Sequence, residues 1–238
     1  INSQFSNLKR VAHTDWIPTA IYFLAKHPSA PVKVKDFLIQ LEKVTLGMEG
    51  MKTSLNERLE RYAKINSKIE TKADLYLIGS EFMLNTEDRE YIISTLSTPD
   101  LYGKRLVKPV LAKIEEQIND GSIAINFGLL SIEHILPQTP TDSYWTSRFT
   151  MDDKLKLTNS LGNLSLISVR KNAQAKNYEF TTKVSVYFKA DGRASNLAMV
   201  NNLLNYPEWT ASNIRKRTIE LLNHFLIAVG LEIIKPHK

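Results

Sequence analysis

A glutamate and a histidine stand side by side in the segment SIEHILPQTP, residues 131–140. Hydrolysis of a phosphodiester needs a side chain that takes a proton from water near neutral pH, and histidine, with an ordinary pKa of about 6.5, can do this. The reaction also needs a divalent cation that polarises a phosphate oxygen and stabilises the leaving oxygen. We therefore interpret His134 as a candidate general base and Glu133 as a candidate metal ligand.

Asparagines downstream of this segment could complete the site. Asn163 follows a glycine 29 residues after His134, and Asn172 lies nine residues further on. Mg²⁺ prefers oxygen ligands and keeps several waters, so one carboxylate and one amide oxygen can suffice. We expect Glu133 and Asn172 to hold Mg²⁺ or Mn²⁺, and Asn163 to hold the backbone near the histidine. Asn177, five residues after Asn172, is the alternative for the metal position.

Each of these residues also has a structural explanation. A lone histidine is usually structural, a Gly-Asn pair is usually a turn, and Asn172 could act only as a helix N-cap. Adjacent side chains of a regular strand point to opposite faces, so we expect a local distortion to bring Glu133 and His134 to one site. Pro137 marks where the regular strand must end. Because these residue types occur together and in this order, we favour the catalytic interpretation.

The second half of the chain supplies the elements that must position these residues. Residues 122–137 are rich in Ile and Leu, and residues 161–169 alternate between apolar and polar, so each predicts a strand. A polar loop of about 20 residues separates them. Residues 170–180 predict a short helix, and residues 209–230 predict a long amphipathic one. The order strand, loop, strand, helix is that of a ββα-metal finger, the nuclease unit called HNH.

The first half of the chain is predicted to be helical. Apolar residues recur at helical spacing in five segments, which are residues 15–27, 31–48, 54–70, 86–96 and 106–120. Ser54 and Glu57 have the spacing of a capping box. No segment gathers a polar cluster, so we interpret residues 1–120 as a helical scaffold and residues 121–238 as the nuclease domain. The expected fold class is α+β, mostly α, with the finger embedded in helices.

Composition excludes several classes of protein. The absence of cysteine excludes disulfides and a thiol nucleophile, and it fits a cytoplasmic protein. No apolar run is long enough to predict a transmembrane helix, so no membrane partner is expected. The net charge of +6 divides into +1 for residues 1–120 and +5 for residues 121–238. The basic half is the one with the Glu-His motif, which favours a polyanionic partner.

The motifs together resemble a known family. They are IEHILPQ, then LGNLSLISVRKNAQAKN, then Phe180 with Lys183, then EWTASNIRKR. In this order, over roughly residues 123–225, they resemble the C-terminal nuclease domain of the GmrSD-type modification-dependent restriction endonucleases. The resemblance implies an HNH fold, metal-dependent cleavage or nicking of DNA, and a role in defence against phage DNA. Each motif alone is weak, but the ordered set is specific.

The resemblance also implies roles for single residues. His134 corresponds to the general base, Glu133 to the carboxylate metal ligand, Asn163 to the loop-ordering asparagine and Asn172 to the position near the metal. Further basic residues are expected to contact nucleic acid, and they are Arg170, Lys171, Lys176, Lys183 and Arg217. For Lys183 and Arg217 a scaffold salt bridge is the alternative. Such contacts would position a phosphate backbone and would not read bases.

The resemblance further implies a partner domain, often N-terminal in the same polypeptide, that hydrolyses nucleotide and senses DNA modification. Residues 1–120 contain neither a Gly-rich phosphate loop nor a DGQQR-like segment, so we interpret the chain as the effector part of a longer protein. Two alternatives stay open. One is a non-catalytic nucleic-acid-binding domain that retains the finger, and the other is an RNA-cleaving HNH nuclease. Only the resemblance favours DNA over RNA.

Overall fold

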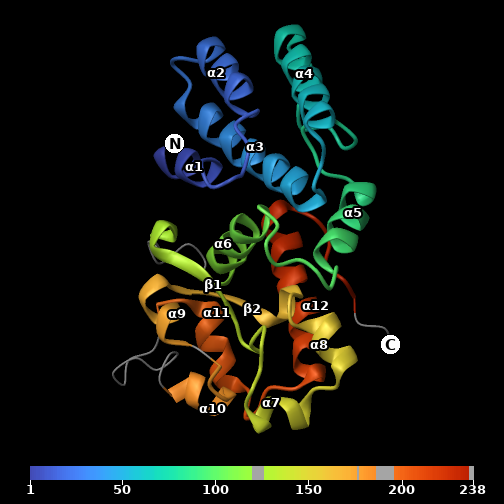
Figure 1. The fold of residues 1–238 in the computed structure, drawn as a ribbon. Helices are drawn as coiled ribbons and strands as arrows, with labels where there is room; N and C mark the ends of the chain where they lie inside the picture. Colours follow the sequence, from blue (N-terminus) through green and yellow to red (C-terminus); the bar gives the residue numbers. More distant parts are fainter. Residues whose placement is uncertain (120–125, 176, 186–195, 236–238) are drawn as a thin grey trace. The chain divides into compact units, whose positions relative to one another are not determined.

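The computed structural model describes residues 1–119, 126–175, 177–185 and 196–235. The chain divides into two compact units, one of residues 1–95 with 226–232 and one of residues 96–225 with 233–238. Across the described residues it is mostly helical with one two-stranded antiparallel sheet, so the predicted α+β, mostly α, class is confirmed (Figure 1). The predicted boundary at residues 120 and 121 lies in a part of the chain outside the described residues, and it stays a prediction.

The first unit is built from helices, and the apolar faces of the first four meet in one core. The helices are α1 (Asn2–Leu8), α2 (Ile17–Lys26), α3 (Pro31–Met51), α4 (Leu55–Thr71) and most of α5 (Thr86–Leu96). Phe37, Leu38 and Leu41 of α3 are fully buried, as their helical spacing predicts. The ring of Phe37 stacks on that of Phe23 from α2, with centroids 3.7 Å apart. Burial of these side chains stabilises the unit by about 2 kcal/mol each.

The start of α4 confirms the predicted capping box. The Ser54 hydroxyl accepts a hydrogen bond from the Glu57 backbone N–H, and the Glu57 carboxylate accepts one from the Ser54 backbone N–H. Two backbone donors that the helix leaves unpaired are satisfied in this way. Local sequence alone therefore fixes where this helix begins.

The second unit contains the motifs and the sheet. Its helices are α6 (Val107–Ile118), α7 (Ser143–Arg148), α8 (Met151–Leu157), α9 (Val169–Ala175), α10 (Phe180–Lys183), α11 (Ala198–Asn201) and the larger part of α12 (Ala211–Val229). Short 3-10 turns lie at η1 (Phe127–Leu129), η2 (Leu161–Asn163) and η5 (Asn202–Asn205). The connection expected as a polar loop contains α7 and α8, which the sequence analysis did not predict. None of the helices in the described residues is long and apolar enough to span a bilayer.

The sheet consists of β1 (Leu130–His134) and β2 (Leu164–Ser168). The two strands are antiparallel, with Glu133 opposite Ser165 and His134 opposite Leu164. The helix α9 follows β2 directly, so the predicted order of strand, connection, strand and helix is present (Figure 1).

Gly162 lets α12 approach the start of β2. A Cβ atom at this position would lie 2.1 Å from the Ile214 carbonyl oxygen and 2.9 Å from the Thr218 backbone nitrogen, which leaves no room for a side chain. The Gly162 backbone N–H instead donates to the Thr218 hydroxyl at 3.2 Å. The glycine of the Gly-Asn pair is therefore required by helix packing, in addition to any role in the turn.

Candidate functional site

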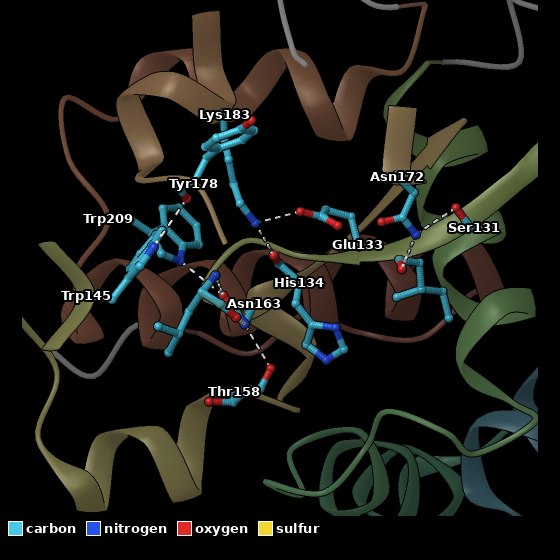
Figure 2. A network of polar contacts seen from close by, with 12 residues as sticks. Ser131, Glu133, His134, Trp145, Thr158, Asn163, Asn172, Tyr178, Lys183 and Trp209 are labelled. Atoms are coloured by element: carbon cyan, nitrogen blue, oxygen red, sulfur yellow. Dashed lines mark hydrogen bonds and ion pairs between the residues drawn. The ribbon is translucent and has the colours of Figure 1, made fainter. Parts of the chain in front are cut away.

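Glu133 and His134 project from opposite faces of β1. Pairing with β2 stays regular through His134, so the strand keeps its alternation to its last residue. Figure 2 shows the Glu133 side chain on one side of the strand and the His134 imidazole on the other. The expectation of a local distortion that turns both groups toward one site was wrong. The structure therefore places the two side chains on opposite faces at the end of the strand and does not bring them together.

The Glu133 carboxylate is paired with a lysine inside the unit. Lys183 of α10 places its Nζ 2.6 Å from Glu133 Oε1 and 2.7 Å from the His134 carbonyl oxygen (Figure 2). Only 1% of Lys183 and 6% of Glu133 are exposed. Burial raises the pKa of Glu133, and Lys183 opposes this shift. Burial lowers the pKa of Lys183, and Glu133 opposes it.

The buried lysine corrects one prediction. A lysine that contacts a DNA phosphate must reach the surface. The Lys183 amine instead donates hydrogen bonds to Glu133 and to the backbone carbonyl of His134, inside the unit. Lys183 instead forms the scaffold salt bridge that was the alternative, with Glu133 as its partner. Phe180, the other residue of the Phe-x-x-Lys motif, explains the spacing, because it anchors the same turn by stacking on Trp209 with centroids 5.3 Å apart.

The two ring nitrogens of His134 differ, because Nε2 forms a hydrogen bond and Nδ1 does not within the described residues. Its Nε2 lies 3.1 Å from the side-chain oxygen Oδ1 of Asn159. An amide oxygen only accepts, so Nε2 carries the proton and Nδ1 is left as an acceptor. Within the described residues no partner is found for Nδ1. The Tyr102 ring packs edge-on against the imidazole, with centroids 4.2 Å apart. Burial lowers the pKa of His134 to about 4; the bond to Asn159 opposes this shift and Lys183 adds to it.

Asn159 is a site residue that the sequence analysis missed. It lies near the end of the connection from β1 to β2, after α8, and its backbone oxygen also accepts hydrogen bonds from the N–H groups of Leu101 and Tyr102, both at 3.1 Å. The residue that orients the imidazole is therefore itself fixed to the segment that carries the packing tyrosine. Four residues upstream of Asn163, it belongs to no motif that sequence spacing would select.

Asn163 fixes the backbone that follows the histidine. Its Oδ1 accepts from the Leu136 backbone N–H at 2.7 Å and from Trp209 Nε1 at 3.1 Å. Its Nδ2 donates to the carbonyl oxygens of Leu136 and Thr158, at 2.9 and 2.8 Å. The side chain is fully buried and both of its polar atoms are engaged. These contacts are those of a residue that holds the segment after His134 in place (Figure 2).

Asn172 and Asn177 contact different parts of the chain. Asn172 Nδ2 donates to Ser131 Oγ at 2.9 Å and to the Ile132 carbonyl oxygen at 3.0 Å, so the first turns of α9 are tied to β1. Asn177 Nδ2 donates instead to the Thr139 carbonyl oxygen in the loop after the strand. The contact with Ser131 places Asn172 on the Glu133 face of β1, because residues two apart share a face.

Three oxygen donors lie on that face, and the Glu133 carboxylate among them is paired with Lys183. The Asn172 Oδ1 makes no hydrogen bond within the described residues, and in Figure 2 it points toward the side of Glu133. Ser165, directly across the sheet from Glu133, is fully buried and its hydroxyl has no partner in the described part of the chain. A carboxylate, an amide oxygen and a hydroxyl are donors that Mg²⁺ accepts together with water. No cluster of three or more His, Asp or Glu side chains suited to a metal occurs among the described residues.

Arg217 is also buried, which corrects a second prediction. It is 3% exposed, and its Nη1 donates to the carbonyl oxygens of Gly162 and Leu164 at 2.7 and 2.8 Å. Burial lowers its pKa to about 10. The guanidinium therefore anchors the start of β2 from α12 and is not on the surface where DNA would contact it.

The remaining predicted basic contacts differ in position. Arg170 is exposed and Lys171 is half-buried at the start of α9. Lys176 lies outside the described residues. A role for these three residues in binding DNA stays a prediction.

Comparison with known families bears on the same segment. The family model described as GmrSD restriction endonucleases, C-terminal domain, matches residues 82–224, which is more than half of the chain. The match includes both strands, α9 and α10, and every site residue described above. The search among curated proteins gives no match.

Proposed function

Because the chain belongs to the family of GmrSD restriction endonuclease C-terminal domains, we propose that it is a metal-dependent DNA endonuclease or nickase with His134 as the general base. Membership of this family supports the coarser conclusion that the chain is a nuclease effector domain whose substrate is DNA. The observation that carries the finer proposal is the hydrogen bond from His134 Nε2 to Asn159, since it leaves Nδ1 as a proton acceptor at the end of β1.

The proposed chemistry is a hydrolysis in which His134 moves one proton. Nδ1 accepts a proton from a water molecule, and the oxygen of that water forms a bond to phosphorus. The phosphorus–oxygen bond to the leaving strand breaks, and the leaving oxygen takes a proton from solvent. Asn159 keeps the imidazole in the tautomer that this step needs. With a pKa lowered to about 4, His134 is unprotonated at neutral pH, and the same shift makes it a weaker base.

Glu133 and Asn172 would hold the Mg²⁺ or Mn²⁺ ion, with Ser165 as a further oxygen donor. A bound cation would stabilise charge on the phosphate oxygens. Lys183 neutralises the Glu133 carboxylate and donates to the His134 backbone carbonyl, so the lysine holds the carboxylate at the end of β1, on the face opposite the imidazole. The order β1, β2, α9 around these residues supports the interpretation as an HNH finger.

The experiment that tests the proposal follows supercoiled plasmid with Mg²⁺ or Mn²⁺ and with EDTA as the metal-free control. We expect His134→Ala to lower cleavage by about 10² to 10⁴, with plasmid binding retained. His224→Gln is the matched control, because His224 lies on α12, away from β1 in sequence. Cleavage by His134→Ala at the parent rate would remove His134 as the base.

The same assay separates the alternatives. A non-catalytic nucleic-acid-binding domain would bind plasmid without cutting it under any metal. An RNA-cleaving nuclease would cut a transcript of the same sequence and leave the plasmid intact. We further propose a role in defence against modified phage DNA together with a nucleotide-hydrolysing sensor domain, and a comparison of modified with unmodified plasmid in the presence of that domain tests it.

A further inference from the structure

A pocket in the first unit contains none of the residues of the nuclease site. It is lined by the end of α2, the start of α3, the end of α4 and the loop after α4. Its volume is about 420 Å³, which is within the range of sites for small molecules and nucleotides. We call it the basic pocket, because four lysines line it, and they are Lys26, Lys33, Lys68 and Lys72.

Two of the four lysines are already paired. Lys26 Nζ lies 2.6 Å from Glu70 Oε2, and Lys68 Nζ lies 3.0 Å from Glu81 Oε2. Asp74, the other carboxylate of the lining, accepts a hydrogen bond from the Tyr76 backbone N–H at 2.9 Å. Glu70 and Glu81 are therefore neutralised by these lysines, whereas Asp74 keeps its charge. Burial raises the pKa of Tyr76, and Asp36 and Asp74 add to this shift.

Lys33 and Lys72 are the two lysines of the lining that have no carboxylate partner among the described residues. Both are exposed, and neither forms an ion pair with any of the described residues. Lys33 lies in the first turn of α3, at the positive end of a 21-residue helix, which adds to the positive potential at the rim. Lys72 ends α4 in the left-handed conformation, with φ of 55°, so the turn that carries it is defined. Two unpaired cations at one opening suit an anion.

The inner wall of the basic pocket is apolar and aromatic. Phe23, Ile69 and Leu75 line it and are almost completely buried. Tyr76 is 46% exposed, so its ring is accessible to a ligand. His27 stacks on Phe23 with centroids 4.2 Å apart, and its Nδ1 donates to the Phe23 carbonyl oxygen at 3.0 Å. In the tautomer with the proton on Nδ1, Nε2 is the acceptor.

We propose that the basic pocket binds a nucleoside phosphate. The phosphate is held by Lys33 and Lys72, and the base lies against Tyr76 and the apolar wall, where a flat ring gains stacking energy. His27 Nε2 accepts from an N–H group on the edge of the base. The same chemistry is offered by a free nucleotide and by a single nucleotide of a DNA strand. This site is separate from the nuclease proposal and does not depend on it.

The test uses the full chain and two classes of probe. AMP, ATP and inorganic pyrophosphate are titrated by calorimetry, and a short fluorescent single-stranded oligonucleotide is titrated by anisotropy. The pocket variant is Lys33→Glu/Lys72→Glu. Its matched control is Lys9→Glu/Lys35→Glu, which makes the same change of charge at exposed positions of the same unit outside the pocket lining. Tyr76→Ala tests the wall for the base.

We expect the pocket variant to weaken binding about tenfold to hundredfold, as for the loss of charge-assisted contacts to phosphate, and the control to bind like the parent. Weaker binding of AMP and ATP identifies a free nucleotide as the ligand, whereas weaker binding of the oligonucleotide alone identifies a DNA strand. Tyr76→Ala should weaken AMP and leave pyrophosphate unchanged. The absence of binding by every probe, or equal losses in the pocket variant and its control, would overturn the proposal. His134→Ala should bind these probes like the parent, so failure of the nuclease proposal is a separate result.

Discussion

The buried ammonium of Lys183 and the carboxylate of Glu133 neutralise each other, with 2.6 Å between Nζ and Oε1. Removing one partner of a buried ion pair leaves the other charge buried without compensation, which typically lowers the free energy of unfolding by about 3–5 kcal/mol. We expect Lys183→Met to lower the free energy of unfolding by about that amount, and Glu133→Gln/Lys183→Met to recover most of it. Urea unfolding of the parent, both single variants and the double variant measures this as a double-mutant cycle. Additive losses in the double variant would show that the two groups do not interact.

Asn159 acts on the reaction through the tautomer of His134. We expect Asn159→Ala to lower the single-turnover cleavage rate about tenfold to hundredfold, as for other residues that orient a catalytic ligand, with DNA affinity unchanged. Asn159→Asp keeps an acceptor for Nε2 and adds a negative charge, so it should raise the pKa of the histidine and move the acid limb of the pH–rate profile to higher pH. An unchanged profile in Asn159→Asp, or full activity in Asn159→Ala, would contradict this role.

At the scale of the elements, α12 and β2 meet where a side chain cannot fit. A Cβ atom at Gly162 would lie 2.1 Å from the Ile214 carbonyl oxygen, and this backbone atom cannot move without shifting the helix. We expect Gly162→Ala to lower the free energy of unfolding by about 1–3 kcal/mol or more. Gly128→Ala is the control, since its nearest atom there is a side-chain oxygen at 3.2 Å. Thermal unfolding of the two variants measures the difference, and equal stability would show that α12 packs less closely.

For the whole molecule, the sequence predicts the helices and strands better than it predicts the contacts between them. Periodicity and the Ser54 capping box predicted α2 to α6, and alternation predicted both strands, because these signals are local. Sequence reasoning missed the short helices α1, α7, α8, α10 and α11, although Thr150 and Asp153 form a capping box that could have indicated α8.

The contacts of the site were harder to predict, because they join residues far apart in the chain. A lysine and an arginine in a basic half suggest a surface that binds phosphate, but Lys183 reaches Glu133 across 50 residues and Arg217 reaches Leu164 across 53. Their burial becomes visible only when the tertiary partners are known. The role of Asn163 in holding the backbone after His134 could be predicted from the sequence, because a Gly-Asn pair before a strand limits what that side chain can contact.

The response of the molecule to acid provides a test of how its histidines are buried. His13, in the first unit, lies between carboxylates: its Nδ1 is 3.5 Å from Asp15 Oδ2 and its Nε2 is 3.7 Å from Glu49 Oε2. Burial, together with Arg58, lowers its pKa to about 4, although Asp15 opposes the shift. In the unfolded chain the pKa is about 6.5. The unfolded state therefore binds a proton first, so the free energy of unfolding falls as the pH drops below 6.5 and this loss levels off near 4.

Each unit of pKa difference corresponds to about 1.4 kcal/mol, so His13 should remove about 2 kcal/mol between pH 7 and pH 5. His13→Gln lacks this titration, and it should lose correspondingly less stability over the same interval. Glu49, whose pKa burial raises, changes stability in the opposite sense. It lies 3.7 Å from His13 Nε2, so the difference between parent and variant reports the histidine together with its effect on this neighbour. Urea unfolding followed by circular dichroism at the two pH values gives the four free energies. Equal losses in parent and variant would mean that the folded first unit does not hold His13 in its neutral form.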